Sequence, residues 1–186
     1  LSRADRVIER LRRDTRQLPP EERASTVESL ILYNITRRLR RKNYDTTKIM
    51  NKSHFLIEDV FYNSILIRAN EILKEIAAEA RVRLPSTLLS NMNRASKALD
   101  ELWDKQAEQY FNRYFISRDF IKEQSLATLV PLYSGAITKS RAKILVELLH
   151  RHDMFASNFP VPSVPLSSSY FQHRRYWQGP VWLNTN

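Results

Sequence analysis

Glycine is almost absent from this chain: Gly135 and Gly179 are the only two among 186 residues. Tight two-residue hairpin turns and phosphate-binding loops both rely on glycine, because it accepts positive φ angles and close backbone approach. Few such turns or loops are therefore expected. Apolar residues still make up 42% of the chain, which is enough for a core. This composition favours long helices joined by irregular loops.

The spacing of apolar residues supports this interpretation. The strongest stretch covers about residues 58–81, where apolar side chains form a wide helical stripe. A stripe of this width predicts that the helix contacts two neighbours. Its members are Phe61, Ile65, Leu66, Ala69, Ile72, Leu73, Ile76, Ala77 and Ala80.

Further helices are expected before and after this one. One starts after Pro20 and ends near Lys42. Three others cover residues 86–103, 124–134 and 141–151. Gly135 should end the helix over 124–134, and Ser140 should cap the helix over 141–151. The sequence thus predicts an all-α fold of about five to seven helices, an estimate that rests on the helical periodicity.

Metal and disulfide chemistry find little support in the sequence. There are no cysteines, so disulfides and thiolate ligands are excluded. The four histidines do not follow a zinc-binding spacing, and His150 and His152 are two residues apart, which directs them to different sides of a helix. We expect no metal site and no cofactor.

The formal net charge is +10, and arginines are dense near the start of the chain. One interpretation is a basic helical module that binds nucleic acid or another polyanion. The other is a set of solvated helix faces. No apolar run approaches the ~20 residues that a membrane span needs, so no membrane partner is expected.

The most informative stretch is residues 176–186, which read YWQGPVWLNTN. Other notable segments, in chain order, are RRDT at 12–15, FLIEDVFYNSIL at 55–66, LWD at 102–104, VPLYSG at 130–135 and FPVPS at 159–163. This ordered set resembles the inverting glycoside hydrolases with an (α/α)6 barrel. That superfamily includes processing α-glucosidases, trehalases, and mannosylglycerate and glucosylglycerate hydrolases.

The resemblance implies a sugar-binding role for a set of side chains. Aromatic rings suit the C–H face of a sugar, and amides suit its hydroxyl groups. From the residues alone, Trp177 and Trp182 are better explained as core residues, and only the resemblance favours sugar binding. The implied substrate-binding residues are Tyr176, Trp177, Gln178, Gly179, Trp182, Asn184, Asn186, Asp59, Asn63 and Arg23.

The resemblance also implies what these 186 residues lack. The family's catalytic acid lies upstream of the segment that matches 12–15, and its catalytic base lies downstream of the segment that matches 182–186. We therefore expect no catalytic residue here. The expected unit is one partial (α/α)6 domain over 1–186, truncated at both ends, with roughly half of the barrel helices.

The implied function is a fragment of a glycosidase that cleaves an α-glucoside or α-mannoside, such as a glycosylglycerate, with inversion. Alone it should be inactive. Two departures weaken a glycerate-specific interpretation: Ser29 stands where such members have Tyr, and Gln178 replaces a common Arg. The expected partner is a carbohydrate, in the cytoplasm, with nucleic acid unlikely and no oligomeric state defined. The alternatives are the polyanion-binding module and a non-catalytic relative of the hydrolase.

Overall fold

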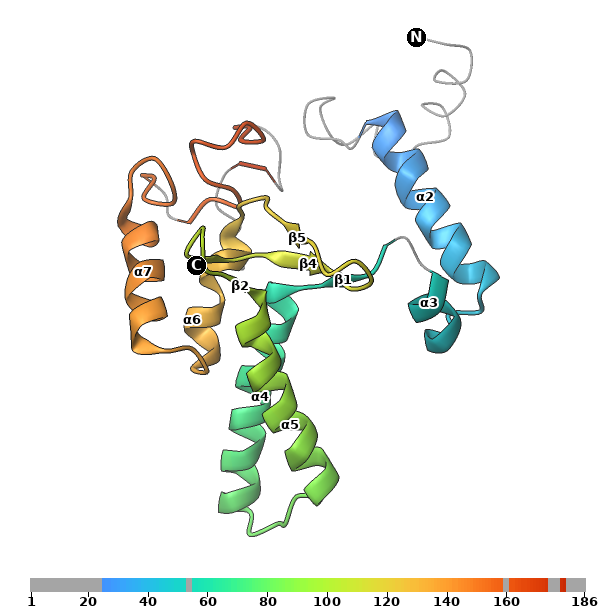
Figure 1. Ribbon diagram of the computed structural model, residues 1–186, viewed down its shortest axis with the longest axis vertical. Helices are drawn as coiled ribbons and strands as arrows, with labels where there is room; N and C mark the ends of the chain where they lie inside the picture. The colour runs from blue at the N-terminus through green and yellow to red at the C-terminus, as the bar shows by residue number, and fades with distance from the viewer. Residues whose placement is uncertain (1–24, 53–54, 159–160, 174–177, 180–186) are drawn as a thin grey trace.

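The computed structural model describes residues 25–52, 55–158, 161–173 and 178–179. These residues are helix-rich with few strands (Figure 1). The helices are α2 (Thr26–Arg41), α3 (Thr46–Lys52), α4 (Val60–Glu79), α5 (Ser86–Ala98), α6 (Pro131–Ser134) and α7 (Lys139–His150), with short 3-10 helices η3 (Leu99–Leu102) and η4 (Leu126–Leu129). The strands are β1 (Ile57–Glu58), β2 (Trp103–Asp104), β3 (Gln109–Tyr110), β4 (Asn112–Tyr114) and β5 (Phe120–Ile121).

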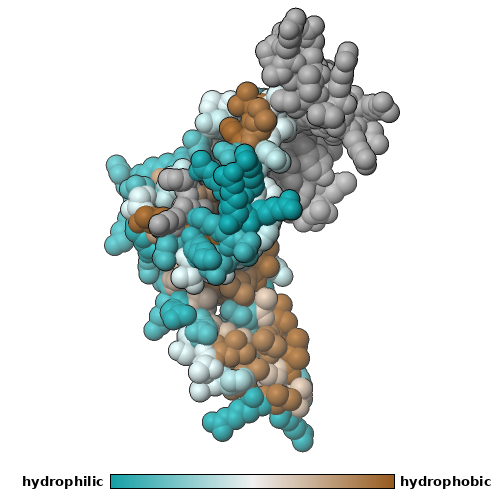
Figure 2. All heavy atoms as spheres, turned by 90° about the vertical axis from the view of Figure 1, so that its right-hand side faces the viewer, coloured by the Kyte–Doolittle hydropathy of each residue, from teal (hydrophilic) through white to brown (hydrophobic). Residues whose placement is uncertain are grey.

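Helix α4 is the longest helix that the structure describes, but of the predicted apolar stripe only Ala77 is buried. One face buries Val60, Ser64, Ile67 and Ala77. This helix packs against both α5 and α6, as the width of the stripe predicted. The rest of the stripe remains exposed, and Figure 2 shows apolar side chains gathered over this part of the molecule. The exposed large members of the stripe are Ile65, Leu66, Leu73 and Ile76, and Tyr62 of the same helix is exposed as well.

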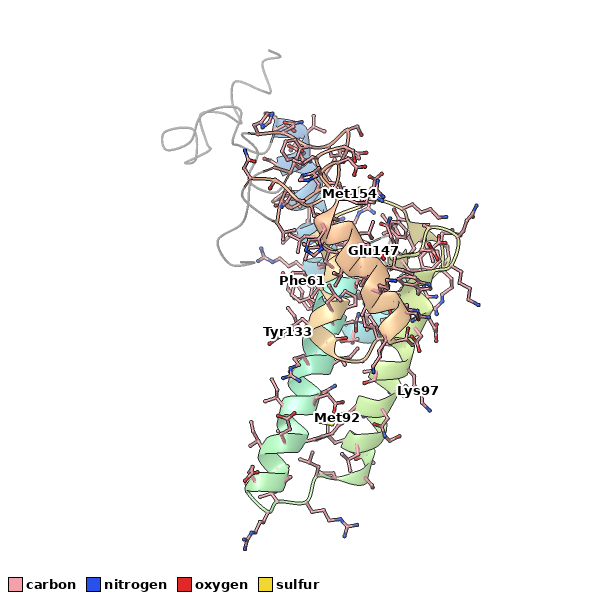
Figure 3. All side chains as sticks on the ribbon, turned by 90° about the vertical axis from the view of Figure 1, so that its left-hand side faces the viewer. Phe61, Met92, Lys97, Tyr133, Glu147 and Met154 are labelled. Carbon is pink, nitrogen blue, oxygen red and sulfur yellow. The ribbon has the colours of Figure 1, made fainter. Side chains whose placement is uncertain are left out.

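Helices α4 and α5 form an antiparallel pair that projects from the small sheets (Figure 1). Met92 of α5 lies between the two helices and is 2% exposed (Figure 3). The hydrophobic core lies above this pair, where α4, η3, β3, η4 and α7 meet. Its buried members are Val60, Ile67, Leu99, Leu102, Tyr110, Leu129, Leu145, Leu148, Met154 and Phe155.

Helix α2 begins with a capping box. The Ser25 hydroxyl accepts a hydrogen bond from the backbone N–H of Glu28, and the Glu28 carboxylate accepts one from the backbone N–H of Ser25. This reciprocal pair satisfies two of the otherwise unpaired N–H groups at the helix start. None of the α2 residues is buried, and Val27 and Ile31 are among its exposed apolar side chains.

Two small antiparallel sheets are the main departure from an all-helical expectation. The first has the order β1-β4-β5, with Glu58 opposite Arg113 and Arg113 opposite Phe120. The second is the β2-β3 hairpin. Their turns do without glycine, because Glu108 (φ 51°) and Arg118 (φ 65°) adopt the left-handed conformation instead. Glycine scarcity therefore does not prevent short strands and their turns.

Two expected helix boundaries are corrected. The predicted helix over 124–134 is split into η4 and α6, because Pro131 is the first residue of α6, where its missing N–H costs nothing. Helix α7 is capped by Thr138 and not by Ser140; the Thr138 hydroxyl accepts from the backbone N–H of Arg141 at 3.4 Å. The Ser140 hydroxyl instead lies 3.0 Å from the Thr138 hydroxyl.

Gly135 ends α6 as predicted, in the left-handed conformation with φ 70°. A Cβ placed there would meet no atom within 4 Å, so any cost of substitution comes from the backbone. We predict that Gly135→Ala lowers the free energy of unfolding by about 1 kcal/mol and that Gly135→Asn lowers it by less, since Asn tolerates this region better. Urea denaturation of the two variants measures both. Equal stability of Gly135→Ala and the parent chain would contradict the backbone explanation.

No helix within the described ranges is long and apolar enough to cross a membrane. The same residues contain no group of three or more His, Cys, Asp or Glu side chains that could hold a metal ion.

Candidate functional site

Asp59 and Asn63, two of the predicted sugar-binding residues, lie together at the start of α4. The Asp59 carboxylate Oδ1 accepts a hydrogen bond from the backbone N–H of Tyr62 at 2.8 Å and so caps the helix. The Asn63 Nδ2 donates to the Asp59 carbonyl at 2.6 Å. Asn112 of β4 also holds this helix start, because its Oδ1 accepts from the Val60 N–H at 2.8 Å.

These contacts leave specific atoms open. Asp59 Oδ2 and Asn63 Oδ1 have no hydrogen-bond partner among the residues that the structure describes. Both side chains are only partly buried. Asp59 therefore has a structural role through one oxygen, and it retains one acceptor atom that a hydroxyl group could use.

Next to this helix start, Arg113 joins three elements. Its Nε donates to Glu58 Oε2 of β1 at 2.5 Å, and its guanidinium also donates to the Glu101 carboxylate at 3.0 Å and to the Glu101 carbonyl at 3.2 Å. Arg118 donates to the same two carboxylates, Glu58 and Glu101. Arg113 is only 8% exposed, so its charge depends on these partners.

The charges in this network support one another. The pKa of the Glu101 carboxyl is lowered, mainly by the hydrogen bond from Arg113. Burial acts to raise this pKa, and the charge of Arg118 lowers it further. Burial acts to lower the pKa of Arg113, but hydrogen bonds to Glu58 and Glu101 outweigh it, and the net pKa is raised. Both groups are therefore charged at neutral pH.

Asn63 and the charged network line one pocket of about 530 Å³. This volume is within the usual range for a small-molecule site. The lining residues are Glu58, Asn63, Asn91, Arg94, Ala95, Ala98, Leu99, Glu101, Leu102, Arg113, Phe115 and Arg118.

Gln178 and Gly179 lie on a different segment. The Gly179 carbonyl accepts from the Ser163 N–H at 3.3 Å, and the Gln178 carbonyl accepts from the Gln172 N–H at 2.7 Å. The side-chain Oε1 of Gln178 is buried without a hydrogen-bond partner in the described structure. A buried amide oxygen in this state costs stability until a donor reaches it, which is the expected condition of a ligand-binding group.

The other predicted site residues, Tyr176, Trp177, Trp182, Asn184, Asn186 and Arg23, lie outside the described residues. Among the residues with described positions, the structure brings Asp59 and Asn63 together. No hydrogen bond between described atoms joins that pair to Gln178 or Gly179.

Sequence reasoning missed the charged network. Asn112 and Arg113 interrupt an aromatic run, and the sequence there predicts only a connection over 110–120 with a short extended piece. A polar pair flanked by aromatic residues was the available signal, because charged side chains within such a run must find partners. Glu58 and Glu101 have no comparable local signal, since Glu58 meets Arg113 through the β1-β4 pairing and Glu101 meets it from η3.

The LWD segment at 102–104 is structural. The Asp104 carboxylate pairs with Lys122 at 2.8 Å and accepts from the N–H groups of Gln106 and Ala107, which shapes the β2-β3 turn. The Arg141 guanidinium lies 5.0 Å from the centre of the Trp103 ring, a cation–π distance. This segment therefore fixes α7 to the second sheet.

Comparisons with known proteins place the chain in a family. Residues 6–186 match the model of the mannosylglycerate hydrolase MGH1-like glycoside hydrolase domain. A mannosylglycerate hydrolase of Thermus thermophilus is 33% identical over 175 residues, covering 94% of this chain and 42% of the relative. A glucosylglycerate hydrolase of Mycolicibacterium hassiacum is 23% identical over 177 residues, covering 88% of this chain and 38% of the relative.

The fold comparison agrees. The crystal structure of a GH63 mannosylglycerate hydrolase from Thermus thermophilus in complex with Tris and D-glycerate superposes with a TM-score of 0.84 at 31% identity, covering 93% of this chain and 41% of that chain. The chain belongs to the MGH1-like glycoside hydrolase family. It spans about two fifths of the length of these relatives.

We predict that Arg113→Met lowers the free energy of unfolding by about 2 kcal/mol or more, because it leaves Glu58 and Glu101 with one cation in place of two. Arg118→Met is the matched control. Arg118 is far more exposed, so its loss should cost less than about 1 kcal/mol. Thermal and urea unfolding measure the difference, and equal costs for the two variants would show that burial of Arg113 is not the cause.

The ion pairs of Glu101 and Asp104 predict that the fold loses stability at acidic pH. Lys122 is the main cause that lowers the pKa of Asp104, as Arg113 is for Glu101. Because each folded pKa lies below its ordinary value (4.5 for Glu101, 3.8 for Asp104), the stabilisation is complete above those values and is lost as the pH falls through the folded pKa. We predict that Glu101→Gln flattens the loss of stability below pH 4.5 and Asp104→Asn the loss below pH 3.8, measured by unfolding at a series of pH values. A parallel loss in parent and variants would be the contrary result.

Proposed function

We propose that this chain forms the sugar-binding part of a glycoside hydrolase domain that acts on an α-mannoside or α-glucoside such as a glycosylglycerate. The observation that carries the proposal is the family match over residues 6–186. Relatives that cover most of the chain are mannosylglycerate and glucosylglycerate hydrolases. In one related structure the bound molecules are Tris and D-glycerate.

In this proposal, one wall of the sugar site combines aromatic rings with polar side chains. Tyr176, Trp177 and Trp182 supply flat apolar surfaces, and Gln178, Asn184 and Asn186 supply amides, while Gly179 allows close approach. Asp59, Asn63 and Arg23 complete the polar contacts. The unpaired Oε1 of Gln178 and Oδ1 of Asn63 support this assignment, because a sugar hydroxyl would satisfy each of them.

We further propose that the catalytic acid and base come from other parts of the family domain. Inverting hydrolysis needs two carboxyl groups about 6.5–9.5 Å apart, one of them with a raised pKa. Carboxylates near the described pocket are already engaged: Glu58 and Glu101 by two arginines, and Asp59 by the helix cap. A carboxylate paired with arginine holds its charge and is a poor proton donor, which supports an acid located elsewhere.

The fold proposal follows from the same comparison. We propose that these helices make up roughly half of an (α/α)6 barrel, as a partial domain over 1–186. The exposed apolar side chains of α2 and α4 support this, because such stripes are covered by neighbouring helices in a complete helical barrel.

An activity comparison tests the proposal. A chimera in which this chain replaces the matching segment of the Thermus thermophilus mannosylglycerate hydrolase should hydrolyse mannosylglycerate, because the remainder supplies the two carboxyls. The 186-residue chain alone should release no sugar. In the chimera, Gln178→Ala should lower kcat/KM about 10- to 100-fold through lost hydrogen bonding, and Gln172→Ala should change it little.

Turnover by the isolated chain at the rate of the chimera would contradict the proposed place of the acid and base. A folded chimera that binds substrate but does not hydrolyse it would favour the non-catalytic relative. The polyanion-binding alternative remains a prediction from the +10 charge, and none of the contacts in the described ranges favours it.

A further inference from the structure

The loop over residues 161–173 is anchored in the hydrophobic core, although it contains no helix or strand. The Leu166 N–H donates to the carbonyl of Met154 at 2.9 Å, and Met154 is a buried member of the core. Nearer the start of the loop, Pro162 and Pro165 are fully buried. A proline ring fixes its own φ angle, so two buried rings leave this part of the loop with little backbone freedom.

Ser163, between these prolines, forms backbone hydrogen bonds in two directions. Its carbonyl accepts from the Leu126 N–H at 2.9 Å, and its N–H donates to the Gly179 carbonyl at 3.3 Å. Leu126 is the first residue of η4, which packs against α4, α6, α7 and β3. A single residue that is only 6% exposed therefore joins the core to the segment that carries Gln178.

A second hydrogen bond holds the same segment from the other end of the loop. The Gln172 N–H donates to the Gln178 carbonyl at 2.7 Å. Backbone donors of one loop thus occupy the carbonyls of both Gln178 and Gly179, and neither peptide group can turn without breaking a hydrogen bond. The Gln178 Oε1, by contrast, is buried with no hydrogen-bond partner in the described structure. An unpaired buried acceptor on a firmly held backbone is typical of a group that is kept in place for a ligand.

We propose that Pro162 is a positioning residue for Gln178. The N–H that reaches Gly179 belongs to the peptide bond between Pro162 and Ser163, so the buried ring of Pro162 sets the direction of that N–H. This inference rests on the proposed function, in which the Gln178 amide binds a sugar hydroxyl. The Pro162 side chain has no polar atom, so it acts on the sugar only through the position of Gln178.

A double-mutant cycle in the chimera with the Thermus thermophilus enzyme tests this role. Pro162→Ala should lower kcat/KM for mannosylglycerate about tenfold, because a small displacement of a binding group is enough for a loss of this size. In the Gln178→Ala background the same substitution should lower kcat/KM less than about twofold, since the side chain that Pro162 positions is then missing. An equal loss in both backgrounds would overturn the proposal.

Pro131→Ala is the matched control. Pro131 is also fully buried, but it is the first residue of α6, and its carbonyl accepts from the Ser134 hydroxyl at 2.7 Å. The substitution should lower the melting temperature, as Pro162→Ala does, and leave kcat/KM within about twofold of the parent chimera. A comparable loss of kcat/KM in Pro131→Ala would show a general effect of destabilisation and contradict the positioning role.

The side-chain amide signals of Gln178 give a readout that needs no activity. In the NMR spectrum of the 186-residue chain they are assigned by their absence from Gln178→Ala. Pro162→Ala should shift these signals and Pro131→Ala should not, and unchanged signals in Pro162→Ala would also overturn the proposal. An inactive parent chimera would count against the proposed glycosidase function, whereas the NMR comparison would still decide on the role of Pro162.

Discussion

Arg113 makes the contacts on which the described fold depends most. One nearly buried guanidinium joins β1 through Glu58 to η3 through Glu101. These elements are far apart in sequence, and the strands involved are only two or three residues long. Strands of that length have too few backbone hydrogen bonds to be stable alone. A buried cation with two carboxylates fixes their register, because only the observed pairing places Glu58 opposite Arg113.

The position of the candidate sugar-binding residues follows from this register. Asn112, next to Arg113, accepts a hydrogen bond from the Val60 N–H, while Asp59 caps the same helix. The start of α4 is therefore held from the sheet and from its own N-terminus, and Asn63 is directed into the pocket beside the charged network. A change that loosens Arg113 should thus affect the geometry at Asn63 without any contact to a substrate.

The sequence predicted the features that depend on local pattern. The helix over α4, its two neighbouring helices and the left-handed Gly135 follow from spacing or from one residue's conformational freedom, whereas the buried face of α4 is formed by Val60, Ser64 and Ile67 and not by the predicted stripe. A short extended piece was expected over 110–120, where β4 and β5 lie, but their pairing into sheets was not, because the turns use Glu108 and Arg118 in place of glycine. Ser140 was preferred to Thr138 because both can cap a helix. The sugar-binding roles of Asp59 and Asn63 stay predictions. The ion pair of Glu58 requires the β1-β4 register and that of Glu101 the packing of η3 against β4, and no local pattern reveals either.

We propose that this chain is part of an inverting glycosidase domain whose acid and base lie in other parts of the family fold. The most direct measurement is the anomeric form of the sugar first released from α-mannosylglycerate by the chimera with the Thermus thermophilus enzyme, followed by proton NMR before mutarotation. The account predicts that β-mannose is released first, because water attacks from the face opposite the leaving group. Release of α-mannose first would contradict it.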